Sequence, residues 1–104
     1  MQLLKDVRNR SIRLTEERRL HLETEHPEMT GQIHRIAETL ANPDKIIRSG
    51  TDATVELFYR HYQSTPVTSK FLCIVVKVLP GDHFIITAYY TDAMNKGEVL
   101  WEKK

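Results

Sequence analysis

The 104-residue sequence has only one cysteine, Cys73, and no long apolar run. A single cysteine excludes an internal disulfide, which is typical of proteins from reducing compartments. No apolar stretch approaches the ~20 residues that a membrane-spanning helix needs, and no secretory signal pattern opens the chain. We therefore expect a cytoplasmic protein without a membrane segment, in which Cys73 is a small buried side chain.

The sequence also lacks an excess of charge of either sign. Fifteen basic and fourteen acidic residues give a formal net charge of +1, which is not the strongly basic balance of a general nucleic-acid-binding protein. Any contact with nucleic acid would have to come from a local cluster of cations. The length predicts one domain over residues 1 to 104, large enough to fold without disulfides.

The first half of the chain has a helical pattern. Residues 1 to 11 are polar and are expected to be a loose or partner-bound leader, and "SIRLT" at 11 to 15 is expected to be a short strand or an extended lead-in. Thr15 is expected to cap a first helix that runs to about Glu25, and Pro27 ends this helix. Thr30 is expected to cap a second helix. Apolar residues of the second helix recur at helical spacing, at Ile33, Ile36, Ala37 and Leu40.

The second half has the alternating pattern of strands. The expected strands cover residues 44 to 49, 54 to 63, 70 to 79, 83 to 91 and 97 to 103. Helices followed by consecutive antiparallel strands indicate an α+β fold. We expect two N-terminal helices packed on one face of an antiparallel sheet of about four strands.

Alternation also predicts which side chains leave the core. The aliphatic set of the 70 to 79 strand should face the helices, which puts Lys77 on the open face. A register that pairs Lys77 with Ile85 also pairs Val75 with Thr87 and Cys73 with Tyr89.

In the 54 to 63 strand, the set of Val55, Leu57 and Tyr59 is assigned to the core, so Arg60 and Tyr62 join the open face. Two cations, a hydroxyl and aromatic rings on one face suit an anionic ligand that can stack. The alternative is an ordinary solvated sheet face.

Several motifs, taken in their order along the chain, resemble one known family. They are "RLTEER", "HPEM", "ETLANPDKII", "ELFYR", "KFLCIVVK", "FIITAYYTD" and "KGEVLWEKK". They resemble a small phage-associated nuclease-like family grouped with barnase, the EndoU endoribonucleases, the colicin-type tRNA-cleaving toxins and the RelE-type toxins. The resemblance implies helices packed on a four-stranded antiparallel sheet and a metal-independent endoribonuclease activity.

The resemblance also implies site residues. The family's helix histidine falls on His21, its "HP" histidine on His26, its strand arginine on Arg60 and its hydroxyl on Thr87, with Tyr89 beside it. The chain departs from the family at Arg19, where an aromatic residue is expected. A charged residue there weakens the apolar face of the first helix and loosens how His21 is held.

Cleavage of RNA without a metal uses the 2′-hydroxyl of the substrate as nucleophile, and it needs a base, an acid and cations around the phosphate. His21 is expected to be the acid, because Glu17 and Glu25 flank it at i−4 and i+4. Arg60 and Lys77 would hold the phosphate. Thr87 would orient the phosphate by a hydrogen bond, so His21, Arg60 and Thr87 are expected to line one concavity as the catalytic residues. The remaining candidates for substrate contacts are Tyr62, Tyr89 and His26.

Three functions from different classes fit these residues. The first is an endoribonuclease, in the manner of a toxin controlled by an antitoxin or immunity protein. The second is a non-catalytic RNA-binding domain, and the third is a protein-interaction module of phage origin. The histidines also have structural alternatives, because His21 can be a surface residue in an ion-pairing helix face. His21 and His26 lack the spacing of a zinc helix, so no metal or cofactor is expected.

Overall fold

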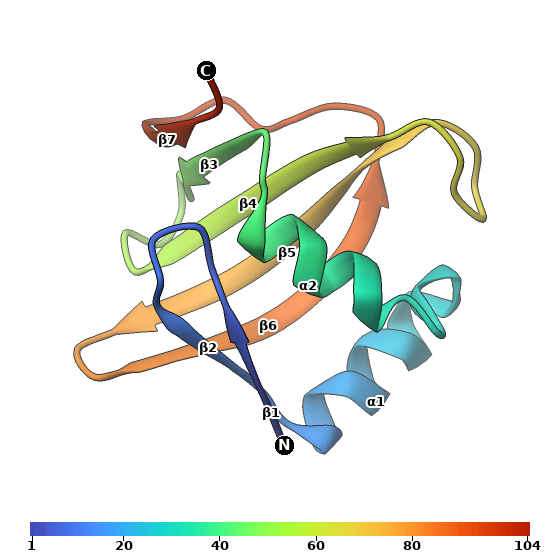
Figure 1. The fold of residues 1–104 in the computed structure, drawn as a ribbon, viewed down its shortest axis with the longest axis horizontal. Coiled ribbons are helices and arrows are strands. Elements are labelled where there is room, and N and C mark those ends of the chain that lie inside the picture. The colour runs from blue at the N-terminus through green and yellow to red at the C-terminus, as the bar shows by residue number, and fades with distance from the viewer.

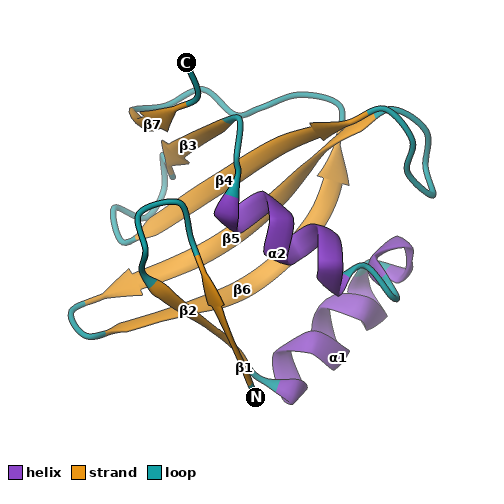
Figure 2. Cartoon of the chain, in the orientation of Figure 1, coloured by secondary structure: helices purple, strands orange, loops and turns teal.

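Two α-helices and seven strands make up the fold, which the computed structural model describes over residues 1 to 104 (Figure 2). The helices are α1 (Glu16–Glu25) and α2 (Ile33–Ala41), with a short 3₁₀ helix, η1 (Pro27–Met29), between them. The strands are β1 (Gln2–Lys5), β2 (Ser11–Leu14), β3 (Lys45–Arg48), β4 (Val55–Tyr62), β5 (Lys70–Leu79), β6 (Asp82–Thr91) and β7 (Val99–Glu102). The α+β class expected from the sequence is confirmed.

The strands form one sheet in the order β1-β2-β6-β5-β4-β3-β7 (Figure 1). All neighbouring strands are antiparallel except β2 and β6, which are joined in parallel through Arg13 and Phe84. The expectation of about four antiparallel strands is therefore wrong. The five segments expected as strands form β3 to β7, and the N-terminal strands β1 and β2 enlarge the sheet to seven strands and make it mixed.

The N-terminal segment is ordered, not the loose leader expected from its polarity. The buried carboxylate of Asp6 accepts hydrogen bonds from the backbone N–H of Arg8 and Arg10, at 3.0 and 2.7 Å, and so closes the turn between β1 and β2. Asn9 supplies the left-handed conformation of that turn, with φ of 63°. The backbone N–H of Val7 donates to the carbonyl of Leu40 and attaches the hairpin to α2.

The starts of the two helices differ in how well the sequence predicts them. Thr15 caps α1 as expected, because its hydroxyl accepts the backbone N–H of Arg18 at 3.2 Å. Thr30 is not the cap of α2. Its backbone N–H donates to the carbonyl of Pro27 and ends η1, Gly31 then reverses the chain with φ of 74°, and α2 begins after Gln32.

The sheet is covered on both faces. The helix face carries the larger core, in which Ile36 and Leu40 of α2 pack on residues such as Phe58 and Leu72. The outer face carries a smaller core, formed by Ile47, Val55, Leu57, Tyr59 and Cys73. Residues after β6 cover that outer core, since Met94 packs against it and the backbone N–H of Asn95 donates to the Tyr59 hydroxyl at 3.1 Å.

This two-sided burial overturns the predicted facing of β4. Phe58 lies in the core of the helix face, whereas Leu57 and Tyr59 lie on the outer face. Arg60 and Tyr62 follow Phe58 and project from the helix face rather than the open one. The alternation is real, but its phase is opposite to the prediction. The apolar set of Val55, Leu57 and Tyr59 is buried in the outer core, while Glu56, on the same side as Phe58, is buried through ion pairs with Arg8 and Arg10.

A β-bulge alters the predicted register between β5 and β6. Val75 pairs with Thr87 and Cys73 with Tyr89, as expected. The register shifts between Val75 and Val76, so Lys77 pairs with Phe84 instead of Ile85.

Cys73 is fully buried, as expected. Neither helix has the length and apolar character needed to span a bilayer.

Candidate functional site

The three residues expected to form the catalytic centre do not share a concavity. Arg60 pairs with Leu72, whose side chain lies in the core of the helix face, and Thr87 pairs with Val75 on the outer face. Paired residues of neighbouring strands point to the same side of the sheet. Arg60 and Thr87 therefore lie on opposite faces, and the prediction that they line one concavity with His21 is wrong.

Arg60 is engaged by the C-terminal end of α2. Its Nη1 donates to the carbonyl of Asn42, the residue that ends α2, at 2.7 Å, and its Nε lies 3.6 Å from Oε1 of Glu38. Cations at this position stabilise the free carbonyls of a helix end. The guanidinium thus joins β4 to α2 and is already partnered in the absence of any phosphate.

Tyr62 belongs to the same polar cluster on the helix face. Its hydroxyl donates to Glu38 at 2.5 Å, and the guanidinium carbons of Arg35 and Arg60 lie 4.5 and 5.6 Å from its ring centroid. Burial, assisted by the Glu38 carboxylate, raises the pKa of Tyr62 to about 12. The phenol is therefore neutral and its hydrogen is engaged, and the ring is placed between cations of the chain itself.

The outer face holds the other expected substrate contacts, but they lie at separate places. Lys77 forms an ion pair with Asp52, with 2.8 Å between Nζ and Oδ2, and this pair lowers the pKa of the Asp52 carboxyl below its usual range. The ring of Tyr89 lies 5.6 Å from that of His26, which reaches it from the end of α1. The hydroxyl oxygen of Thr87 is buried and has no hydrogen-bond partner.

His21 lies on α1 and is about half exposed. Its Nε2 is 3.0 Å from Oε1 of Glu25, one helical turn later, which is one of the two flanking contacts expected from the spacing. The other flanking residue, Glu17, forms no ion pair and leaves its carboxylate free. Helix α1, which carries His21, runs beside β6 (Figure 1).

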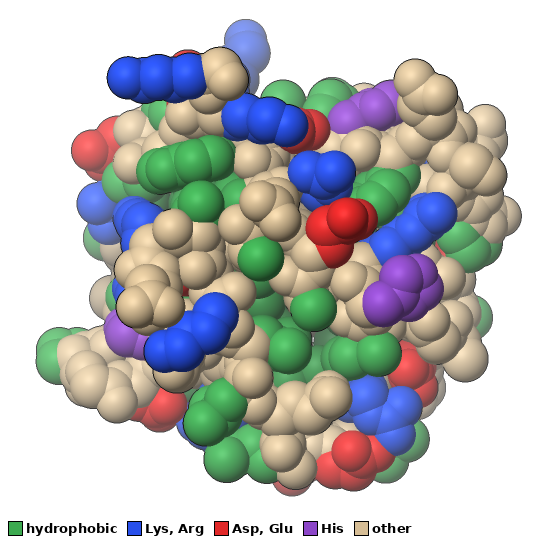
Figure 3. All heavy atoms as spheres, viewed as in Figure 1, with side chains coloured by type: hydrophobic (Ala, Val, Ile, Leu, Met, Phe, Trp, Pro, Cys, Tyr) green, Lys and Arg blue, Asp and Glu red, His purple; other side chains and the backbone are tan.

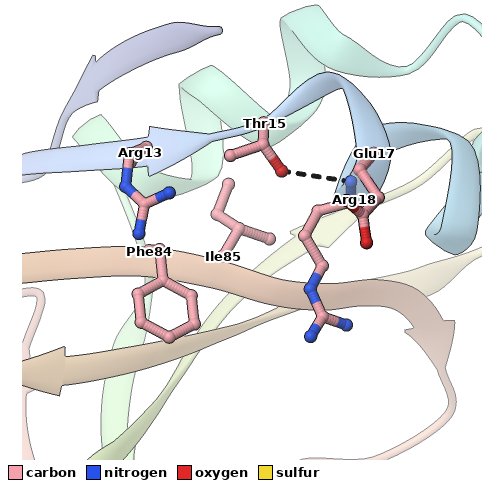
Figure 4. A pocket seen from close by; sticks show the side chains of 6 residues that line it. All are labelled: Arg13, Thr15, Glu17, Arg18, Phe84 and Ile85. Atoms are coloured by element: carbon pink, nitrogen blue, oxygen red, sulfur yellow. Dashed lines mark hydrogen bonds between the residues drawn. The ribbon is translucent and has the colours of Figure 1, made fainter.

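Two adjoining hollows lie along this part of the surface. The first hollow measures about 260 Å³ and is lined by Arg13, Thr15, Glu17, Arg18, Phe84 and Ile85 (Figure 4). The second hollow measures about 530 Å³ and is lined by Glu17, Arg18, Leu20, His21 and Thr24. Glu17 and Arg18 line both hollows, so the two lie next to each other along α1, and we call them together the depression.

The two arginines of the depression differ in whether they form ion pairs. Arg13 pairs with Asp82, whereas the Arg18 guanidinium forms no ion pair. Figure 3 shows basic and acidic side chains interspersed on the face that α2 covers, without a broad basic patch there. Arg18 is thus an exposed arginine without an ion pair, three residues before His21 on the same helix.

Sequence reasoning missed Arg13, Arg18 and Phe84. Strict alternation from Thr87 puts Phe84 on the face opposite to that of Thr87, and only the bulge brings it to the outer face beside Lys77. Arg18 carried a usable signal, because it stands three positions before His21 and shares a helix face with it. The sequence around Arg13 gave no such signal, because the strand pairing of Arg13 with Phe84 joins distant parts of the chain.

Comparisons with known proteins do not identify a family for the chain. No family model, no curated protein and no solved structure matches it. Within the fold, no three histidine, cysteine or acidic side chains converge at a distance suitable for holding a metal ion. The case for a function therefore depends on the geometry of the depression and on the resemblance described above.

Proposed function

We propose that the chain is a metal-independent endoribonuclease whose reacting groups lie on α1. The observation that carries the proposal is that Glu17, Arg18 and His21 line one hollow. Glu17 and His21 are four residues apart, a spacing that puts their side chains side by side on a helix. A carboxylate, an imidazole and an unpaired guanidinium are the groups needed to cleave a phosphodiester without a metal.

In the proposed reaction the 2′-hydroxyl of a nucleotide attacks the adjacent phosphorus. Glu17 accepts the proton of that hydroxyl, and His21 gives a proton to the departing 5′-oxygen. The products are a 2′,3′-cyclic phosphate and a free 5′-hydroxyl, so that no water is consumed. Arg18 neutralises the charge that builds on the phosphate oxygens, with a fork of donors that matches them.

Geometry changes the roles proposed for the remaining residues. Arg60 and Tyr62 are proposed to hold α2 on the sheet, because both already bind groups at its C-terminal end. His26 and Tyr89 are proposed to hold the far end of α1 against β6, through their ring contact. In this proposal these four residues position the helix that carries the reacting groups.

Cleavage of a labelled RNA in the presence of EDTA tests the proposal. The parent protein should produce 2′,3′-cyclic phosphate ends. His21→Ala should lower the rate by roughly 10²- to 10⁴-fold, the usual contribution of one acid or base, and Glu17→Gln should do the same. His34→Ala is the matched control, because His34 is an exposed histidine on α2, and it should cleave at the parent's rate.

A second candidate function, RNA binding without cleavage, is favoured by the contact between His21 and Glu25, which occupies one ring nitrogen. Binding without any cleavage by the parent would support this second function. A parent that neither binds nor cleaves RNA would leave the third, a protein-interaction module. If the nuclease is active, an antitoxin or immunity protein that covers the second hollow belongs to the same proposal.

A further inference from the structure

We propose that the first hollow is a nucleobase subsite, which makes single-stranded RNA the substrate. The inference rests on the proposed function, because it extends the same depression from the reacting groups to the neighbouring nucleotide. The base would stack on the paired side chains of Arg13 and Phe84, while the phosphate beside it binds Arg18.

The position of the hollow follows from the topology. Strand β2 meets β6 through a single residue pair, Arg13 and Phe84, and the chain then leaves the sheet at Thr15 to enter α1. The divergence of the two segments opens a space above β6. Figure 4 shows Arg13 and Arg18 reaching toward β6 from β2 and α1, with the ring of Phe84 beside Arg13.

Arg13 and Phe84 form a cation–π pair in the lining of the first hollow. The guanidinium carbon of Arg13 lies 5.2 Å from the ring centroid of Phe84, within the range of a cation–π contact. Asp82 forms an ion pair with the same guanidinium, with 3.2 Å between Nη2 and Oδ2. Nucleobases stack on aromatic rings and on guanidinium planes alike, and neither surface requires a particular base.

The dimensions favour part of a polymer over a whole small molecule. At about 260 Å³ the first hollow is smaller than the usual pocket for a small-molecule ligand, roughly 300–1,000 Å³. It adjoins the second hollow, because Glu17 and Arg18 line both. One ring system therefore fits the first hollow, and the chain that follows it passes Arg18 and reaches His21.

A base in a duplex is stacked between its neighbours and cannot lie on this pair without being extruded. The subsite thus predicts that the protein binds single-stranded RNA more tightly than duplex RNA, and that this binding needs the Phe84 ring. The phosphate contact at Arg18 predicts, in addition, that binding weakens as the salt concentration rises.

The test measures binding rather than cleavage. A fluorescein-labelled single-stranded RNA is titrated into the His21→Ala protein in EDTA, so that the oligonucleotide survives. Adding Phe84→Leu should weaken binding roughly 5- to 100-fold, the effect of losing one base–aromatic stack. Adding Phe71→Leu instead is the matched control, because Phe71 lies on the outer face but contacts His61, and binding should not change.

Two further measurements make the result specific. An RNA with an abasic site at the bound position should bind the Phe84→Leu and Phe84 proteins equally, and a duplex of the same sequence should bind both weakly. Unchanged circular dichroism of Phe84→Leu confirms that the fold survives.

The inference is overturned if Phe84→Leu binds single strands as tightly as its parent, or if duplex RNA binds equally well. Binding without cleavage by the unsubstituted protein would instead overturn the proposed nuclease function and leave the subsite standing.

Discussion

Arg10 reaches across the sheet to Glu56, a residue 46 positions later in the chain, with 2.7 Å between Nη2 and Oε1. Arg8 donates to the same carboxylate oxygen, and the side chain of Glu56 is almost completely buried. Together with Asp6, these residues form a network of two carboxylates and two guanidinium groups between the β1–β2 turn and β4. The network compensates for the burial of a carboxylate on the helix face.

Removing that carboxylate should destabilise the fold. Glu56→Gln leaves Arg8 and Arg10 without their shared anion, and we expect the free energy of unfolding to fall by roughly 3 kcal/mol, the low end for a broken buried ion pair, because the arginines are partly hydrated. Urea titration measures the change. Glu16→Gln is the control, since Glu16 also pairs with an arginine but is exposed, and it should leave stability nearly unchanged. Equal effects of the two substitutions would contradict the prediction.

The outer core should make the protein less stable in alkali. Burial raises the pKa of the Cys73 thiol from 9.0 to about 11 and that of the Tyr59 hydroxyl from 10.0 to about 12. Between these values the folded state holds protons that the unfolded state has lost. The stabilisation is complete below about pH 9 and is lost as the pH rises, by at most about 1.4 kcal/mol per pH unit for each group.

Urea unfolding over a series of alkaline pH values measures this slope. Tyr59→Phe removes one titrating group and should make the slope shallower. A stability that is constant up to about pH 11 would show that these groups do not titrate differently on unfolding.

Cys73 should be chemically inert in the folded protein. The thiol is fully buried, and its raised pKa keeps it protonated, whereas the thiolate is the reactive form. A thiol reagent such as Ellman's reagent should react at neutral pH only as fast as the protein opens, and at once in denaturant. Immediate labelling of the native protein would show that the loop after β6 does not cover the outer core.

Gly97 should not tolerate a side chain. A Cβ at this position would lie 2.8 Å from the carbonyl oxygen of Arg48 and 2.9 Å from Cγ2 of Ile47. Gly97→Ala therefore forces β3 and the segment before β7 apart, and we expect a loss of about 1–3 kcal/mol. Gly50→Ala meets no atom within 4 Å and should be neutral. Thermal or urea unfolding measures the stability of both variants, and equal stabilities would contradict the prediction.

The sequence predicted helices and central strands well because their periodicity is local. The cap at Thr15, the stripe of α2 and the register of Val75 with Thr87 all depend on residues close together in the chain or joined by a short turn. It failed at β4, where Val55 and Leu57 belong to the more apolar set but lie in the outer core, and Phe58 faces the helices. Alternation fixes two sets but cannot say which one meets the helices when both faces are buried.

The same limit explains the candidate site. His21 and its flanking glutamates were found because helical spacing relates them directly. Arg60 and Thr87 were predicted on one face because the two faces of β4 were assigned the wrong way round. The position of Phe84 could not be predicted because the alternation of β6 gives no sign of the bulge. The partners of the N-terminal segment were invisible for another reason, because Glu56 lies far from Arg8 and Arg10 in the chain.

Since β2 joins the sheet by a single residue pair with β6, the N-terminal hairpin has no place to dock until most of the chain has assembled. Strands β3 to β6 pair with their neighbours in sequence, so short loops close first. We expect the amides of β1 and β2 to gain protection from hydrogen exchange last during refolding, and to lose it first in the native state. Such partial opening would free Glu56 and separate Arg13 from Phe84 while the central strands stay paired, which couples the integrity of the depression to the least stable part of the fold.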